Sequence, residues 1–347
     1  MSTTNIIKLT QYSSGAGCGC KISPSVLKEI LATSEDFPPH PALIVGHDSN
    51  DDAAVIEDAK GNWIISTTDF FMPIVDDAYD FGKIAATNAL SDVYAMGGTP
   101  LMAVAILGWP ISKLPASEAA RVVEGGRFIC RMAGIPLAGG HTIESPEPFF
   151  GLAVTGTVER EHLRKNNTPQ QGDVLFITKP IGLGVITTAA KRGLDASDEL
   201  QEAISYMCTL NKMGAELARI RGVHAMTDIT GFGLIGHLLE MIQSPDLCAT
   251  LDYASIPVLP AARKWVSQFV YPDMTTKNHS AFSSFVSPLN AEQMLLLNDP
   301  QTSGGLLVSV SPEEAHQVGE VMMRFGILEP KPIGQIERNG EIKISVK

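Results

Sequence analysis

Apolar residues in the first half of the chain form short runs of strand length that alternate with longer segments of helical period. The run at 100–108 is apolar enough to predict a buried strand. Gly97 and Gly98 follow a helical segment and are typical of a helix end. We expect strands at 63–68, 100–108 and 151–158 and helices at 23–33, 81–96 and 117–133.

The second half has a similar content of strands and helices, although no repeated sequence links it to the first. The stretch 271–287 is polar and has no clear period, so we expect a long loop there. Strands are expected at 173–178, 249–253 and 304–310 and near Gln335 and Ile344, and helices at 183–192, 198–220, 233–242 and 312–325.

The polar segment 159–172 separates the two halves and predicts a domain boundary. A chain of 347 residues is long enough for two domains, each with its own core. We therefore expect a mixed α/β protein in three parts. These are a flexible glycine-rich arm and linker at 1–50, an N-terminal α/β domain at 51–160 and a C-terminal α/β domain at 161–347.

Composition and charge exclude several classes of protein. The net charge of −12, without clustered Lys and Arg, argues against nucleic acid as a partner. No apolar run reaches the roughly 18 to 20 residues that cross a bilayer, and we see no targeting segment. The cysteines are too few and too scattered for a disulfide framework. We expect a cytoplasmic protein without a membrane partner.

Two cysteines stand apart from the others because they lie in the glycine-rich stretch 15–21. Alternating glycines allow the backbone to lie close to a ligand, and Lys21 together with unpaired backbone N–H groups would lower the pKa of Cys18 or Cys20. The stretch therefore predicts an electropositive loop with a reactive thiol. The alternative is a flexible arm whose cysteines are incidental. The simplest interpretation of Cys130, Cys208 and Cys248 is that they are small core residues.

Five aspartates lie near the ends of predicted elements or on one helix face. Adjacent carboxylates such as Asp51 and Asp52 need a compensating cation, and oxygen ligands from several elements suit Mg²⁺ that bridges substrate phosphates. Each aspartate could instead be a cap or a turn residue. The candidates are Asp51, Asp52, Asp69, Asp92 and Asp228.

Glycine-rich motifs for nucleotide binding are ambiguous in this chain. No Walker A pattern is present. The segment 139–142 could place backbone N–H groups against a phosphate or form a tight turn, and 299–305 is a turn that could face a ligand. The hexapeptide 231–236 matches GxGxxG, with Asp252 near the expected separation, and supports an NAD-binding alternative. Against it, Asp228 would repel a pyrophosphate unless a metal intervened.

Seven motifs taken together resemble the selenophosphate synthetase family, also called selenide, water dikinase. They occur in the family's order from about residue 8 to the C-terminus. They are GAGCGCK at 15–21, DDAAV at 51–55, STTDFF at 66–71, ATNALSD at 86–92, AGGHT at 138–142, MTDITGFG at 226–233 and DPQTSGG at 299–305.

The resemblance implies the fold of aminoimidazole ribonucleotide synthetase, with two α/β domains and a homodimer that closes the ATP site. It also implies the conversion of ATP, selenide and water to selenophosphate, orthophosphate and AMP, which supplies activated selenium for selenocysteine and selenouridine. Mg²⁺ would be the cofactor, ATP would bind to the N-terminal domain, and a selenium-delivery protein is a further expected partner.

By the same resemblance, Cys18 occupies the cysteine or selenocysteine position, and Lys21 is the essential cation beside it. The implied Mg²⁺ ligands are Asp52, Asp92 and Asp228. The implied ATP contacts are Lys21, Ser49, Asn50, Asp51, Asp69, Asp92, Gly140, His141 and Thr142. Cys20 matches the motif without an implied catalytic role.

The chain departs from the family pattern at two places. Ser14 stands where some relatives would have histidine, and Lys277 stands in the place of an arginine. Lysine keeps the charge but lacks the planar fork that binds a phosphate through two hydrogen bonds.

Two other classes of function stay open. One is a synthetase of the same fold that releases ADP, and the other is a thiol redox module built on Cys18 and Cys20.

Overall fold

The computed structural model of the chain describes residues 7–20, 26, 29–30, 40–46, 51–338 and 340–347. Two six-stranded sheets form its framework. Neighbouring strands are antiparallel except for the parallel pairs β4 with β5 and β9 with β12. The first sheet has the order β1 (Leu43–Val45), β2 (Ala54–Glu57), β3 (Trp63–Phe71), β6 (Phe149–Val158), β4 (Thr99–Trp109), β5 (Leu137–Glu144). The second has the order β12 (Ile344–Val346), β9 (Leu247–Leu251), β11 (Gly334–Arg338), β7 (Val174–Ile177), β10 (Leu306–Val310), β8 (Val223–Asp228).

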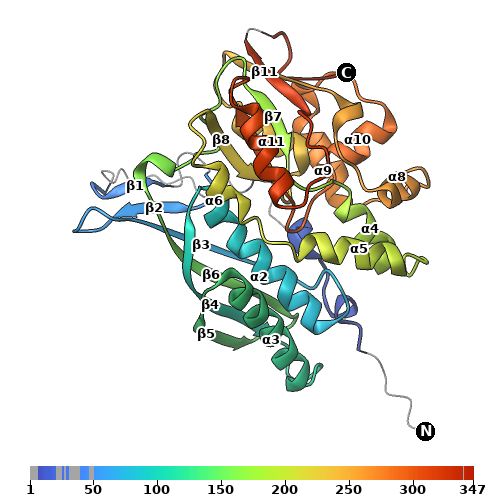
Figure 1. Cartoon of the computed structure of the whole chain (residues 1–347). Coiled ribbons are helices and arrows are strands. Elements are labelled where there is room, and N and C mark those ends of the chain that lie inside the picture. The colour runs from blue at the N-terminus through green and yellow to red at the C-terminus, as the bar shows by residue number, and fades with distance from the viewer. Residues whose placement is uncertain (1–6, 21–25, 27–28, 31–39, 47–50, 339) are drawn as a thin grey trace.

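Helices cover one face of the first sheet and surround the second (Figure 1). Two long helices belong to the first sheet, namely α2 (Ala78–Ala95) and α3 (Ala116–Ala133). The helices of the second half are α4 (Leu183–Lys191), α5 (Ser197–Met207), α6 (Met213–Leu217), α7 (Gly233–Met241), α8 (Pro260–Val266), α9 (Asp273–Phe282), α10 (Ala291–Leu297) and α11 (Ala315–Arg324). The expected mixed α/β architecture is confirmed.

Helix α2 is the central element of the molecule because it packs against both halves. It contacts β3, β6 and α3 on one side and β8, α5 and α6 on the other. Gly82 lets α3 come close, since a Cβ there would lie 1.9 Å from the Val122 carbonyl oxygen. Nearly every residue of α2 is buried, including the polar Asn88, Ser91 and Asp92. Polar groups are rarely buried without a partner or a function, so these three point to a site.

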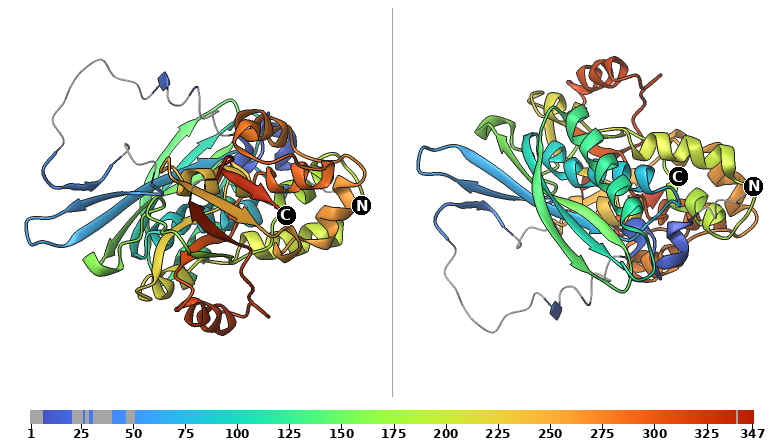
Figure 2. Two further views of the ribbon diagram at one scale, coloured as in Figure 1. Left: turned by 90° about the horizontal axis from the view of Figure 1, so that it is seen from above. Right: turned by 90° about the horizontal axis from the view of Figure 1, so that it is seen from below.

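The outer face of the first sheet is open. On β3, Thr67 and Phe71 face inward and are buried, whereas the intervening Phe70 is 52% exposed. Leu101 and Met102 on β4 are exposed as well. The prediction of a buried strand at 100–108 is therefore wrong for its first half, because helices cover only one side of this sheet. Figure 2 shows the hairpin of β2 and β3 projecting beyond the body of the protein.

Three other expectations differ from the structure. The helix predicted at 198–220 is divided into α5 and α6, because the buried Asn211 amide between them donates to Ser91 Oγ at 2.8 Å and to the Gly304 carbonyl at 3.0 Å. The predicted loop at 271–287 contains α9, with Asn278 buried on its inner face. Asp69 lies inside β3 rather than at its end, since the strand continues to Phe71.

The described part of the N-terminal segment lies against both halves. It forms two short 3₁₀ helices, η1 (Leu9–Tyr12) and η2 (Gly17–Cys20). Gly17 N–H donates to the Met72 carbonyl at 3.1 Å, next to the end of β3. Gly17 has φ +50°, and a Cβ there would lie 2.3 Å from Thr302 Oγ1, so this turn requires glycine. Within the described residues, no helix is both long and apolar enough to span a membrane.

Candidate active site between the two halves

Three aspartates from distant parts of the chain meet between the two sheets. Asp52 precedes β2, Asp92 lies on α2 and Asp228 ends β8. One carboxylate oxygen from each lies within 4.8 Å of the other two. They line a cavity of about 180 Å³. The sequence-predicted metal ligands are thus brought together.

Hydrogen bonds satisfy only part of this cluster. Thr67 Oγ1 donates to Asp92 Oδ2 at 2.5 Å, and Thr227 Oγ1 donates to Asp52 Oδ1 at 2.8 Å. Asp52 Oδ2 and Asp228 Oδ2 are buried and have no hydrogen-bond donor among the described residues. Buried carboxylate oxygens without donors are costly unless a cation binds them.

Burial and mutual repulsion raise the pKa of two of these carboxyl groups. The pKa of Asp52 lies well above its ordinary value because of burial first and the nearby Asp228 second. The pKa of Asp92 is raised by burial and then by Asp69. A divalent cation would reverse both effects, since it favours the ionised carboxylates. Oxygen donors that converge from three elements fit Mg²⁺, so the residues present suit the implied metal.

Two further predicted residues line the same cavity. Asp51 Oδ1 accepts a hydrogen bond from Asn166 N–H at 2.8 Å, which ties it to the segment between the two sheets. Asp69 Oδ2 accepts one from Asn88 Nδ2 at 2.6 Å. Both carboxylates are therefore held in place beside the three-aspartate cluster.

Gly140, His141 and Thr142 lie elsewhere in the chain. They belong to β5, the edge strand of the first sheet, and β6 and β4 separate β5 from β3. The tight-turn alternative is wrong, because parallel pairing with β4 keeps this segment extended. The three residues line a separate hollow with Arg127 and do not line the carboxylate cavity of their own chain.

The thiol-bearing loop is only partly described. The Cys18 and Cys20 backbones form part of η2, whereas Lys21, Ser49 and Asn50 lie outside the described residues. Lys277 lies on α9 and lines a cleft of about 670 Å³ beside this loop rather than the carboxylate cavity. Of the other cysteines, Cys130 and Cys248 are buried and Cys208 is half-buried, close to the prediction of core residues.

The topology excludes a dinucleotide fold around the segment 231–236. In that fold, the strand after the helix lies in the same half of the sheet as the strand before it. Here β8 and β9 lie far apart, with β10, β7 and β11 between them. The NAD-binding alternative is therefore wrong, and Asp228 belongs to the carboxylate cluster instead.

Several residues in and around the cavity were not among the candidates that the sequence suggested. Thr67 and Thr227 orient the aspartates, and His237 and Glu240 on α7 line the cavity, 2.9 Å apart between Nδ1 and Oε2. The threonines lie within the motifs around Asp69 and Asp228, which is the one signal that could have found them.

Asp299, in the loop before β10, is a buried acid with an unusual proton affinity. Its Oδ2 accepts hydrogen bonds from Gly184 N–H at 3.0 Å and from Gln301 Nε2 at 2.8 Å, while Oδ1 is buried without a partner among the described residues. Burial raises the pKa of Asp299 to about 8. The folded protein therefore binds this proton more tightly than the unfolded chain does.

We expect Asp299→Asn to stabilise the protein in a pH-dependent way. From about pH 4 to about pH 8, ionisation of Asp299 favours the unfolded chain, by at most about 1.4 kcal/mol per pH unit. Asparagine has no such proton, so the free energy of unfolding of the variant, relative to the unaltered protein, should rise across this range and level off above it. Urea unfolding at pH 5, 6, 7 and 8 measures the difference, and a constant difference would contradict the assignment.

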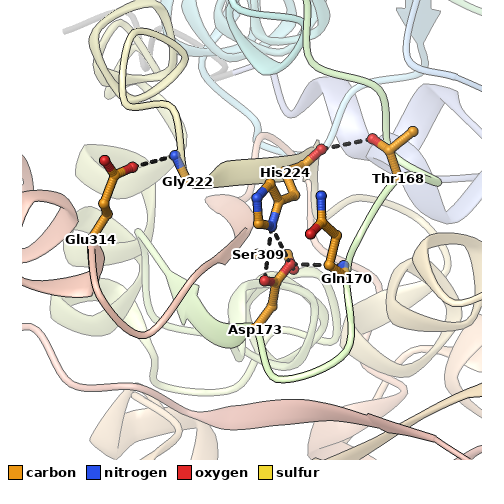
Figure 3. A network of polar contacts seen from close by, with 7 residues as sticks. All are labelled: Thr168, Gln170, Asp173, Gly222, His224, Ser309 and Glu314. Carbon is orange, nitrogen blue, oxygen red and sulfur yellow. Dashed lines mark hydrogen bonds and ion pairs between the residues drawn. The ribbon is translucent and has the colours of Figure 1, made fainter.

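A second polar cluster lies in the C-terminal sheet and resembles a catalytic triad only in composition (Figure 3). The buried Asp173 accepts hydrogen bonds from His224 Nδ1 at 2.8 Å and from Ser309 Oγ at 2.7 Å. The serine thus donates to the aspartate and not to the histidine, so no base activates it. We interpret the cluster as a structural connection of β7, β8 and β10.

Comparisons with known proteins cover both halves of the chain. Residues 50–158 match the family model described as AIR synthase related protein, N-terminal domain, and residues 170–347 match the corresponding C-terminal domain. The selenide, water dikinase of Shewanella sp. (strain MR-4) is 54% identical, over 97% of this chain and 96% of that protein. That of Escherichia coli (strain K12) is 51% identical, over 99% of each.

Solved structures with low sequence identity share the fold. The thiamine-monophosphate kinase of Stenotrophomonas maltophilia K279a aligns with a TM-score of 0.63 at 18% identity, over 88% of this chain and 92% of that one. The hydrogenase maturation protein HypE in complex with ATP aligns with a TM-score of 0.62 at 18% identity, over 80% and 78%. The expected aminoimidazole ribonucleotide synthetase-like fold is confirmed.

Proposed function

This chain belongs to the selenide, water dikinase family, and from that premise we propose that it converts ATP, selenide and water to selenophosphate, orthophosphate and AMP. The observation that carries the proposal in this molecule is the meeting of Asp52, Asp92 and Asp228 in one cavity between the two halves. A polyphosphate cannot approach three carboxylates unless cations lie between them. The cavity therefore suits a reaction of metal-bound ATP.

We propose that Asp52, Asp92 and Asp228 bind Mg²⁺. The ion would supply positive charge that offsets the charge of the phosphates as a phosphoryl group is transferred. Thr67 and Thr227 hold one oxygen of Asp92 and one of Asp52 and leave other oxygens for the metal. Lys21, Asp51 and Asp69, with the neighbouring Ser49 and Asn50, would complete the ATP contacts on this side of the site.

We propose that the glycine-rich stretch 15–21, which contains Cys18, acts on selenium. Hydrogen selenide is an anion at neutral pH, so the main barrier is electrostatic, and Lys21 would lower it. In this hypothesis a delivery protein carries a perselenide, and the Cys18 thiolate displaces its thiolate and takes the terminal selenium. That selenium attacks the γ-phosphorus and displaces ADP, whose hydrolysis would give AMP and orthophosphate. A thiol reductant then cleaves the S–Se bond, forming a mixed disulfide with Cys18 and releasing selenophosphate, and a second reductant thiol restores the Cys18 thiol.

Cys18→Ser tests whether this transfer is obligatory. The hydroxyl of serine cannot accept selenium from a perselenide, so we expect selenophosphate synthesis from a perselenide donor to fall at least about a hundredfold, while Mg-ATP binding stays intact. Cys130→Ser, which alters a buried thiol away from the site, is the matched control. Full activity of Cys18→Ser with the perselenide donor would show that Cys18 at most orients the substrate.

We propose a homodimer that completes the ATP site. Exposed apolar side chains on the open face and edge of the first sheet support it, among them Phe70, Leu101, Met102 and Ile143. Apolar surface of this kind is typical of a protein interface. In such a dimer, Gly140, His141 and Thr142 of one subunit would face the carboxylate cavity of the other.

We also propose how the chain divides into domains and in which cellular compartment the protein works. The two sheets support an N-terminal domain at 51–160 that binds ATP and a C-terminal domain at 161–347, with 1–50 as the catalytic arm and linker apart from β1, which belongs to the first sheet. Cys130, Cys208 and Cys248 are free, as expected in a reducing compartment, which supports a cytoplasmic location.

The nucleotide product distinguishes this function from its alternative. We expect anaerobic incubation with Mg-ATP to give AMP in proportion to added selenide, measured by anion-exchange chromatography. ADP as the sole product would instead support a different synthetase of the same fold. Absence of nucleotide binding by the folded protein would revive the thiol redox module.

A further inference from the structure

A buried lysine lies directly behind the candidate ATP site. Lys179 follows the end of β7 and is only 4% exposed. Lysine is almost never buried without a partner that holds its ammonium group. Here the ammonium donates a hydrogen bond to the Ser303 carbonyl at 2.8 Å, and burial lowers the pKa of Lys179 to about 7.

The fold brings Lys179 next to the loop that precedes β10. Strand β10 pairs with β7 on one side and with β8 on the other. Lys179 follows the end of β7 and Asp228 ends β8, so both residues lie beside the start of β10. Gly305 allows the two backbones to approach closely, because a Cβ there would lie 2.3 Å from the backbone nitrogen of Lys179. The neighbouring Ser303 has φ +54°, a conformation that is uncommon for a residue other than glycine.

The contacts continue from Ser303 to the candidate site in two further hydrogen bonds. Ser303 N–H donates to Asn88 Oδ1 at 2.8 Å, and Asn88 Nδ2 donates to Asp69 Oδ2 at 2.6 Å. Both ends of the Asn88 amide are thus engaged, which fixes its orientation. The chain of contacts joins a lysine of the C-terminal half to a carboxylate of the N-terminal half that lines the cavity.

We propose that Lys179 is a positioning residue for the nucleotide site, which acts through the Ser303 peptide and the Asn88 amide to hold the Asp69 carboxylate in the orientation that binds ATP. The inference rests on the proposed function, because it assigns the nucleotide to the cavity that Asp69 lines. It adds a residue that touches neither metal nor substrate.

The chain of contacts explains why a long side chain with a hydrogen-bond donor is used at this place. The left-handed conformation of Ser303 is unfavourable on its own, so the hydrogen bond from Lys179 to its carbonyl helps to maintain it. Asn211 supports the same loop from the other side, where its amide donates to the Gly304 carbonyl at 3.0 Å. Without Lys179 the loop can relax, and Asn88 then loses the donor that orients it.

Nucleotide affinity tests the proposal independently of turnover. The probe is the β,γ-methylene analogue of ATP with Mg²⁺, titrated by isothermal titration calorimetry. We expect Lys179→Met and Asn88→Ala each to weaken binding about tenfold. Because both residues act in one chain of contacts, the double variant should also be about tenfold weaker, rather than about a hundredfold.

Controls separate positioning from loss of charge or of fold. Lys331→Met removes the charge of an exposed lysine and should bind as the unaltered protein does. Circular dichroism and thermal unfolding check each variant, and Lys179→Gln, which keeps a donor for the Ser303 carbonyl, should bind more tightly than Lys179→Met.

Three results would overturn the proposal. Unaltered binding by folded Lys179→Met, or by Asn88→Ala if Lys179→Met does not fold, would show that this chain of contacts does not position the nucleotide site. Additive losses in the double variant would show that Lys179 and Asn88 act separately. Failure of the unaltered protein to bind the analogue would overturn the proposed function as well, so the two failures are distinguishable.

Discussion

Replacement of Asp52 by asparagine is expected to reduce selenophosphate synthesis at least about a thousandfold, because it removes a ligand charge from the metal that the phosphates need. Asparagine can still accept the hydrogen bond from Thr227 Oγ1. It also removes a carboxyl group whose pKa is raised by burial and by Asp228. The metal-free variant should therefore be more stable than the metal-free original.

The difference in stability between metal-free Asp52→Asn and the metal-free original protein should grow as the pH rises. Because the folded protein holds the Asp52 proton more tightly than the unfolded chain does, the metal-free protein loses stability as the pH rises above about 4. Asp52→Asn lacks this loss, and we expect its melting temperature at pH 7 to be about 2 to 5 °C higher. Mg²⁺ should then raise the melting temperature of the original protein and not that of the variant.

Differential scanning fluorimetry with and without Mg²⁺ measures both effects alongside turnover. The matched control is Asp246→Asn, which changes the charge of an exposed aspartate away from the cavity. A metal response that survives in Asp52→Asn would contradict the assignment of Asp52 as a ligand.

Mixed dimers should regain activity that both parent variants lack. If one subunit supplies the carboxylates and the other supplies Gly140, His141 and Thr142, Asp52→Asn and His141→Asp damage opposite sides of the same site. In a mixed dimer one of the two sites then carries both defects and the other carries none. Random exchange of subunits should restore about a quarter of the original activity.

The measurement is the turnover of an equimolar mixture after subunit exchange, compared with each variant alone. The parents should have almost no activity, since Asp at position 141 places negative charge where the phosphates would approach. A mixture as inactive as its parents, with dimer exchange demonstrated by differently tagged subunits, would show that each site is built within one chain.

Local sequence patterns predicted the elements whose stability depends on their own residues. The helix expected at 81–96 is α2, and the helix expected at 117–133 is α3, each within a few residues. The break between α5 and α6 depends instead on Asn211, whose partners Ser91 and Gly304 are far away in sequence. A periodicity in hydrophobic residues carries no information about such contacts.

The helix α9 was missed for a related reason. Its inner face is held by Asn278, whose amide donates to the Gly231 carbonyl at 2.9 Å and to the Asn298 carbonyl at 3.1 Å. A helix that buries an amide rather than a row of apolar side chains has a weak hydrophobic pattern. Tertiary contacts therefore decided the structure of this segment.

The candidate site was predictable where motifs contain it and hidden where it depends on long-range contacts. The motifs around Asp52, Asp92 and Asp228 predicted that these three residues form one site. Lys179 belongs to none of them, and its partner Ser303 is 124 residues away in sequence. Proximity of this kind follows from sheet order, which the sequence of a single chain does not reveal.

The proposed reaction forms a phosphorus–selenium bond, which can be observed directly. Anaerobic ³¹P NMR of the protein with Mg-ATP, a thiol reductant and selenide should show AMP, orthophosphate and a new phosphorus resonance with coupling to ⁷⁷Se. The resonance should be absent when selenide is omitted. Nucleotide turnover that yields only ADP, or no turnover by the folded protein, would contradict the account.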